Sequence, residues 1–274
     1  MENSFAAAGG IAAVIVVGAV SRMLGSRPPW IRWTASLLAA VAVGGIVGFA
    51  GKFSAKYETY QSPATASAAV EKEMLRLAPN VVAVMKQNDS RAWKAFITEA
   101  GRRMANSNGN LTDADKAWLQ AQIQGMSKNM WRTASGAGDD AIIALGRQEI
   151  AVDETLQREA IGMCASRGQP LWDLNALPPL SFSEVQRYGE KIELAYLDGK
   201  THQTPLVTND QATSLFQQAV ALKEAPLSDA DVTYLVSGDR TDEARTCRVR
   251  LQFEKNVLAI PQSASLLRWL YANQ

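Results

Sequence analysis

Residues 5–20 of this chain read FAAAGGIAAVIVVGAV, and residues 33–50 read WTASLLAAVAVGGIVGFA. Neither stretch contains a charged side chain. The hydrocarbon core of a bilayer is about 30 Å thick, and roughly 17 to 25 apolar residues in a helix cross it. The two stretches therefore predict a pair of transmembrane helices, over about residues 5–21 and 33–50.

A cleaved signal peptide and a pair of buried core helices are the alternatives for these stretches. A signal peptide begins with a basic segment, whereas the only charged side chain before residue 5 is Glu2. Helices that cover a soluble core carry a polar stripe, which both stretches lack over their whole length. We therefore expect residues 1–51 to form an uncleaved helical hairpin in a membrane.

The turn between the two stretches indicates the orientation of this hairpin. It contains Arg22, Arg27 and Arg32 and no acidic residue, whereas two lysines follow the second stretch. Lys and Arg are enriched in short cytoplasmic loops, so we expect the turn in the cytoplasm and both termini on the other side. The alanine-rich, uncleaved hairpin points to a bacterial inner membrane crossed twice, with the bulk of the chain in the periplasm.

Small residues recur at every fourth position in both predicted spans. They are Ala40, Gly44 and Gly48 in the second span, and Ala6 with Gly10 and Gly9 with Ala13 in the first. Residues of this size at this spacing let helix backbones approach closely. They serve either to pack the hairpin or to join it to another copy or another membrane protein. No ionisable residue lies within either span, which argues against proton or ion conduction.

The chain has two cysteines, Cys164 and Cys247, and both follow the predicted anchor. An even number of cysteines in an oxidising compartment is typical of a disulfide. Two unrelated buried thiols are the alternative. Because the charge pattern places this region outside the cytoplasm, we expect the bridge. In the chain-entropy model, closing so long a loop stabilises the fold by about 4 kcal/mol.

We expect the rest of the chain to be a polar linker, residues 52–67, and one helical soluble domain, residues 68–274. The first 51 residues hold three arginines and one glutamate, which leaves 25 basic and 26 acidic side chains. The domain therefore lacks the basic excess of a nucleic-acid-binding protein. The expected class of the whole chain is mainly α.

Apolar residues at helical spacing predict helices almost throughout this domain. Thr112 and Ser228, each followed three residues later by an acid, are predicted helix N-caps. Asp139 is the expected cap of a long helix, which continues to Ser166. Residues 171–181, LWDLNALPPLS, are expected to be an extended connector because paired prolines oppose a helix.

Residues 246–258 allow two interpretations. Cys247, Val249, Leu251 and Phe253 alternate with polar side chains, which is the period of a strand. No second stretch of matching quality is present to pair with it, and a lone strand is unstable. We therefore expect a helix here, with one short β element as the alternative.

No pattern of residues points to a catalytic, cofactor-binding or metal-binding site. The only histidine, His202, lies in a polar stretch that we expect to be a surface loop. One histidine and two distant cysteines lack the ligand spacing of zinc sites. Phosphate-loop, serine-hydrolase and zinc-protease motifs are missing from the sequence. We accordingly predict no cofactor, and a plain helix–helix turn at residues 136–138.

A carboxylate is the remaining route to catalysis. Helical enzymes that hydrolyse envelope glycans or peptides can use one buried glutamate as the acid. Nothing in the sequence ranks the candidates, and each is expected on an exposed helix face. They are Glu149, Glu154, Glu159, Glu184 and Glu193.

The leading expectation for function is an anchored interaction or scaffold domain that binds another envelope protein or itself. A membrane-tethered envelope enzyme and an immunity or exclusion protein that binds an incoming toxin or phage component are the alternatives. A cleft around a buried carboxylate would favour the enzyme, and an exposed apolar surface would favour binding.

Overall fold

The computed structural model describes residues 62–107, 111–167, 174–237 and 240–273. Within these ranges the chain forms eleven α-helices and one 3-10 turn, with no strand, as the sequence predicted. The predicted hairpin, with its arginines and its small residues, lies outside the described residues. No helix in the described part is both long and apolar enough to span a membrane.

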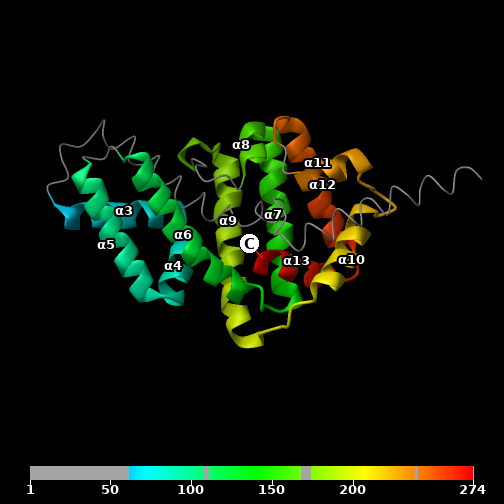
Figure 1. Ribbon diagram of the computed structural model, residues 1–274, viewed down its shortest axis with the longest axis horizontal. Coiled ribbons are helices and arrows are strands. Elements are labelled where there is room, and N and C mark those ends of the chain that lie inside the picture. The colour runs from blue at the N-terminus through cyan, green and yellow to red at the C-terminus, as the bar shows by residue number, and fades with distance from the viewer. Residues whose placement is uncertain (1–61, 108–110, 168–173, 238–239, 274) are drawn as a thin grey trace, which may run out of the picture.

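The first four helices of the described part lie together at one end of it (Figure 1). They are α3 (Pro63–Leu77), α4 (Pro79–Asn88), α5 (Ser90–Asn106) and α6 (Asp113–Ala134). Helix α3 begins at Pro63, within the segment that we expect to link the predicted hairpin to the domain. The Ser62 hydroxyl accepts a hydrogen bond from the Thr65 amide and Pro63 takes the first helical position, two features that start a helix.

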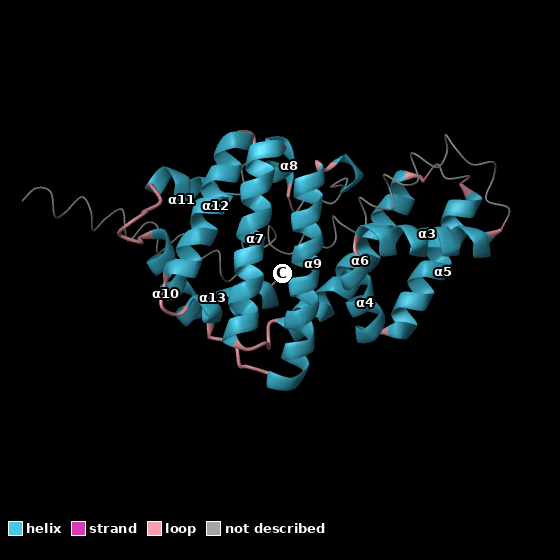
Figure 2. Cartoon of the chain, turned by 180° about the vertical axis from the view of Figure 1, so that it is seen from behind, coloured by secondary structure: helices cyan, strands magenta, loops and turns pink. Residues whose placement is uncertain are grey.

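The remaining helices form the other end, and α9 stands between the two groups (Figures 1 and 2). Helix α9 packs against α7 on one side and against α4 and α6 on the other. The elements are α7 (Asp139–Glu159), α8 (Ile161–Ser166), a 3-10 turn (Leu174–Ala176), α9 (Pro179–His202), α10 (Asn209–Val220), α11 (Asp229–Ser237), α12 (Glu243–Ala259) and α13 (Ser263–Ala272).

Three predicted boundaries around α7 to α9 were wrong. The expected long helix to Ser166 is broken at Ala160, where the backbone leaves the helical region (φ −156°, ψ 68°). Gly138 occupies its N-cap position instead of Asp139. Within the expected extended connector, α9 already begins at Pro179, because proline is well tolerated in the first helical turn. The same helix continues to His202, which therefore lies in a helix and not in a loop.

Helix α12 resolves the ambiguity at residues 246–258 in favour of a helix, as expected. It packs against α7, α8, α10, α11 and α13. Because neighbours cover several of its sides, Cys247, Val249 and Phe253 are all buried although they do not share one narrow helical face. The alternating pattern therefore reflected a broadly buried helix.

The two predicted caps are confirmed. The Thr112 hydroxyl accepts from the Asp115 amide, and the Asp115 carboxylate accepts from the Thr112 amide, which makes a complete capping box at α6. The Ser228 hydroxyl accepts from the Asp231 amide at the start of α11, at 3.1 Å.

Candidate functional site

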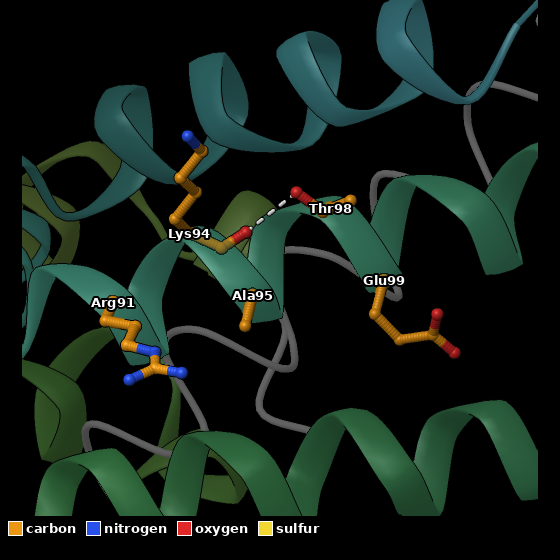
Figure 3. A pocket seen from close by; sticks show the side chains of 5 residues that line it. All are labelled: Arg91, Lys94, Ala95, Thr98 and Glu99. Atoms are coloured by element: carbon orange, nitrogen blue, oxygen red, sulfur yellow. Dashed lines mark hydrogen bonds between the residues drawn. The ribbon is translucent and has the colours of Figure 1, made fainter.

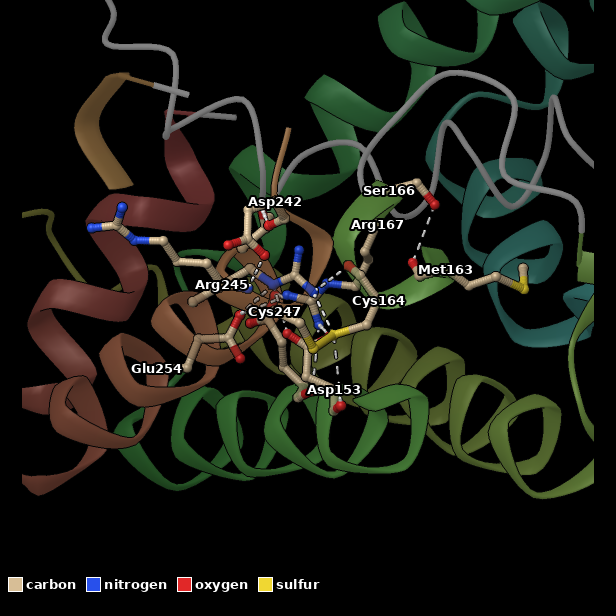
Figure 4. Close-up of a disulfide and its surroundings, with 12 residues drawn as sticks. Asp153, Met163, Cys164, Ser166, Arg167, Asp242, Arg245, Cys247 and Glu254 are labelled. Atoms are coloured by element: carbon tan, nitrogen blue, oxygen red, sulfur yellow. Dashed lines mark hydrogen bonds and ion pairs between the residues drawn. A yellow bond between two sulfur atoms is a disulfide. The ribbon is translucent and has the colours of Figure 1, made fainter. Parts of the chain in front are cut away.

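Cys164 of α8 and Cys247 of α12 form the predicted disulfide (Figure 4). Their Cα atoms lie 5.6 Å apart, and 83 positions separate them in the sequence. Both side chains are fully buried. The bridge therefore fastens the short helix α8 onto α12 inside the protein.

Five charged side chains lie beside this disulfide and are here named the ionic cluster. They are Glu149 and Asp153 of α7, Arg167 directly after α8, and Arg250 and Glu254 of α12. Their side chains are at most 10% exposed, so ion pairs within the cluster are shielded from water.

Each arginine of the ionic cluster joins several elements. The Arg250 Nε atom lies 2.7 Å from Asp153 Oδ2, and its Nη2 donates to the Cys164 carbonyl at 2.6 Å. The Arg167 Nη1 atom lies 2.8 Å from Asp153 Oδ1. Its Nη2 lies 2.8 Å from Glu149 Oε1 and 2.7 Å from Glu254 Oε1. The cluster thus ties α7, α8 and α12 together at the bridge.

Burial dominates the proton equilibria of this cluster. It raises the pKa of Glu149, an effect that the charge of Arg167 opposes. Burial also raises the pKa of Glu254 well above its usual value, and the neighbouring Asp153 adds to the effect. The Tyr271 hydroxyl of α13 donates to Glu149 Oε2 at 2.9 Å. Burial opposes the charge of Arg167, but its three carboxylate neighbours prevail and raise its pKa.

The structure corrects one expectation about the five candidate glutamates, because Glu149 is buried and not on an exposed helix face. Both of its carboxylate oxygens are engaged, one by Arg167 and one by Tyr271. A substrate would reach it only after the surrounding helices had opened.

The other four candidates do not come together around Glu149. Glu154 pairs with Lys255 at the surface, and Glu159 accepts from the amide and hydroxyl of Ser181. Glu184 accepts from Gln148 Nε2 at 2.7 Å, and Glu193 accepts from Asn80 Nδ2 at 2.6 Å. These four carboxylates thus contact neighbouring side chains in separate parts of the domain.

A surface hollow of about 450 Å³ lies on α5 (Figure 3). Its lining residues are Arg91, Lys94, Ala95, Thr98 and Glu99. Glu99 bonds to Arg102 and Arg103, and the hydrogen bond from Arg102 lowers the pKa of Glu99 despite the opposing effect of burial. Glu99 is therefore an anion at neutral pH, unsuited to act as a general acid. Because one helix supplies every lining residue, the hollow does not enclose a small molecule.

His202 lies at the end of α9, next to the turn between α6 and α7. Its Nδ1 is 2.9 Å from Asp198 Oδ1, while Asp198 Oδ2 accepts from the Gly138 amide at 2.6 Å. The predicted helix–helix turn at residues 136–138 is thus held by Asp198. Among the described residues, no group of three or more histidine, cysteine or acidic side chains is placed to hold a metal ion.

Two of the exposed apolar side chains of the described residues are leucines that lie close together on the solvent side of α9, and sequence reasoning missed them. Leu194 is 54% exposed and Leu197 is 40% exposed, one helical turn apart. We name them the leucine pair. Arg187, Glu190 and Lys200, all exposed, lie on the same helix beside it. The sequence did contain a signal for this pair. The two leucines, three positions apart, fall on the polar face of the helix and not on its apolar face.

The described part of the chain thus offers a buried ionic cluster beside a disulfide and an exposed leucine pair. The ionic cluster contains carboxyls with raised pKa values but is not accessible to a substrate. The leucine pair is accessible and apolar but contains no reactive group. Comparison of the chain with protein-family models, with curated proteins and with solved structures finds no match.

Proposed function

We propose that this chain is a membrane-anchored helical interaction domain of the bacterial envelope, and that its soluble part binds another envelope protein. The two apolar stretches of the sequence support the anchor. The disulfide supports an oxidising compartment, because such bridges persist outside the cytoplasm. The arginines of the turn at residues 21–32 point to the same side.

The leucine pair is the observation that carries the binding function. Removing apolar surface from water is favourable by about 25 cal/mol per Å², so a partner that covers Leu194 and Leu197 gains affinity there. Helices that dock into grooves use apolar anchors at a spacing of three or four residues, as this pair does. The charged neighbours Arg187, Glu190 and Lys200 form the polar rim that is usual around an interface core.

Anchoring makes modest affinity sufficient for such a function. Two components held at one membrane meet at a high effective concentration, which strengthens binding without any new contact. The domain is also nearly neutral, so an apolar contact has no strong net charge to overcome. A small apolar patch is therefore adequate for a tethered binder.

Photo-crosslinking in intact cells tests this proposal. A photo-reactive residue at Leu194 is expected to give one discrete adduct with an envelope protein. Leu180 is the matched control, because it is exposed on the same helix and lies about 21 Å away at 1.5 Å per residue. Leu197→Lys is expected to weaken the adduct at Leu194 about tenfold, since a charge replaces the apolar contact. Equal labelling at Leu194 and Leu180, or no adduct at either, would contradict the proposal.

A tethered envelope hydrolase remains the alternative, and the burial of Glu149 is the observation in its favour. A carboxyl whose pKa is raised by burial can serve as a general acid. The test compares two variants in cells that show a phenotype when the protein is deleted. The enzyme is favoured if a folded Glu149→Gln variant fails to restore the normal phenotype while Leu197→Lys restores it. The interaction proposal predicts the opposite pattern for these two variants.

A further inference from the structure

Two carboxylates of the ionic cluster share a single hydrogen-bond donor. The Nη2 atom of Arg167 is 2.8 Å from Glu149 Oε1 and 2.7 Å from Glu254 Oε1. The two oxygens are consequently no farther apart than the sum of those distances. Like charges this close inside a protein disfavour simultaneous ionisation.

The neighbouring charges do not offset this repulsion in full. Within the cluster, three carboxylates face two guanidinium groups. The charged groups that act on Glu254 are Glu149 and Asp153 of α7, Arg167 after α8, and Arg250 of its own helix. Two buried tyrosines, Tyr188 of α9 and Tyr271 of α13, also interact electrostatically with Glu254. Arg240, before α12, is influenced by Arg250, and its pKa is lowered to about 10, mainly by burial.

The second oxygen of Glu254 adds an independent observation. Among the described residues, Glu254 Oε2 is a buried atom without a hydrogen-bond partner. A buried carboxylate with one oxygen left without a hydrogen bond is costlier to desolvate than a neutral carboxyl, although Arg167 and Arg250 lie 2.7 and 3.8 Å from the other oxygen of Glu254. The Tyr188 hydroxyl is also buried without a partner in the described part.

We propose that Glu149 and Glu254 share one proton in the folded domain, so that the contact between α7, α12 and Arg167 weakens as the pH rises. Burial favours the neutral form of both carboxyls and raises the pKa of each. The five side chains of the ionic cluster then carry no net charge among themselves, with two guanidinium groups, two carboxylates and one neutral carboxyl.

Linkage fixes the direction of the effect. A carboxyl whose folded pKa is raised holds a proton that the unfolded chain has already released. Its stabilising contribution is complete below the ordinary carboxyl pKa, and it is lost as the pH rises through the folded value. Within that window, one proton changes the unfolding equilibrium constant tenfold per pH unit.

Other carboxyls change the stability with pH in the opposite direction. The pH dependence of the wild type alone therefore does not isolate Glu254, and a comparison with a variant is needed. The pKa of each of these groups is lowered by hydrogen bonding that outweighs burial, and they stabilise the fold above the ordinary carboxyl pKa. They are Glu71, Glu99, Asp115 and Asp231. Their effect is the same in the wild type and in a variant at Glu254, and therefore cancels in the ratio.

The test is urea unfolding of the full chain in mild detergent, with the disulfide intact, followed by circular dichroism from about pH 5 to about pH 8. The wild type is compared with Glu254→Gln. Glu154→Gln is the matched control, because Glu154 and Lys255 also join α7 to α12 but pair at the surface, at 2.7 Å.

The unfolding equilibrium constant of the wild type, divided by that of Glu254→Gln, is expected to rise close to tenfold per pH unit over part of this range. The corresponding ratio for Glu154→Gln is expected to stay constant. A constant ratio for Glu254→Gln as well would overturn the proposal.

A second measurement decides the matter if Glu254→Gln does not fold. In the wild type, the side-chain carboxyl carbons of glutamate are followed by NMR as the pH is changed. One carboxyl is expected to titrate well above the ordinary range. Titration of all glutamates within the ordinary range would overturn the shared proton regardless of the variant.

Discussion

Arg248 and Arg250 lie two positions apart on α12, yet their environments differ. Arg250 is buried and bonds to Asp153 and to the Cys164 carbonyl. Arg248 is exposed and pairs with Asp231 at the surface. Removing one partner of a buried ion pair costs about 3 to 5 kcal/mol, whereas an exposed pair contributes at most about 1 kcal/mol.

We therefore expect Arg250→Met to lower the free energy of unfolding by about 3 to 5 kcal/mol and Arg248→Met by less than about 1 kcal/mol. Urea unfolding of both variants measures the difference. Equal losses for the two would mean that the ionic cluster contributes nothing specific to stability.

At this same scale, the disulfide could be predicted from the sequence and the ionic cluster was not. The even number of cysteines and the expected oxidising compartment were enough to predict the bridge between Cys164 and Cys247. Glu149 was expected at the surface, although Leu145, Glu149 and Val152 follow one another at helical spacing and are all buried. A carboxylate in register with an apolar stripe was the available signal. Its partner Arg167 could not be found, because that contact depends on how α8 packs.

Helix α8 is short and is joined to α12 by the disulfide. It has six residues, and a helix of this length is not stable alone. We expect the double variant Cys164→Ala with Cys247→Ala to lose about 4 kcal/mol of stability, as the chain-entropy model gives for a long loop. Hydrogen exchange is expected to rise first in α8. Uniformly unchanged exchange across α8 would contradict this role of the bridge.

Glycines distinguish crowded from open helix surfaces. A Cβ at Gly199 of α9 would overlap the Thr133 carbonyl at the end of α6, whereas a Cβ at Gly125 of α6 would meet nothing within 4 Å. We expect Gly199→Ala to destabilise the domain by more than about 1 kcal/mol, as overpacking does. Gly125→Ala is expected to stabilise it by about 0.5 to 1 kcal/mol through helix propensity. Thermal unfolding of the two variants shows whether each substitution raises or lowers the melting temperature. A change in the same direction for both would refute the packing argument.

Element boundaries show where sequence reasoning stops. The caps Thr112 and Ser228 were predictable because they depend on local hydrogen bonds. The break at Ala160 was not predictable, because neither glycine nor proline occupies that position and the chain turns there to place α8 against α12. Pro179 was misjudged as a helix breaker, although it occupies the first turn of α9.

For the whole molecule, the all-α class of the soluble part is confirmed over the described residues, since the helical period was strong in almost every segment. The hairpin of residues 1–51 and its orientation stay predictions, because they rest on the hydropathy and charge of residues outside the described part. If the predicted anchor is correct, the leucine pair offers an exposed apolar surface to a partner at the same membrane.

The central claim is that an anchored helical domain lies outside the cytoplasm, and cysteine labelling in intact spheroplasts tests it most directly. Asn273 is exposed at the end of α13, and Ser26 lies in the turn that we expect in the cytoplasm. The native cysteines are buried in their disulfide and do not compete for the reagent. We predict that a membrane-impermeant thiol reagent labels Asn273→Cys at once, and Ser26→Cys only after the membrane is permeabilised. Immediate labelling of Ser26→Cys with protection of Asn273→Cys would place the domain in the cytoplasm and contradict the account.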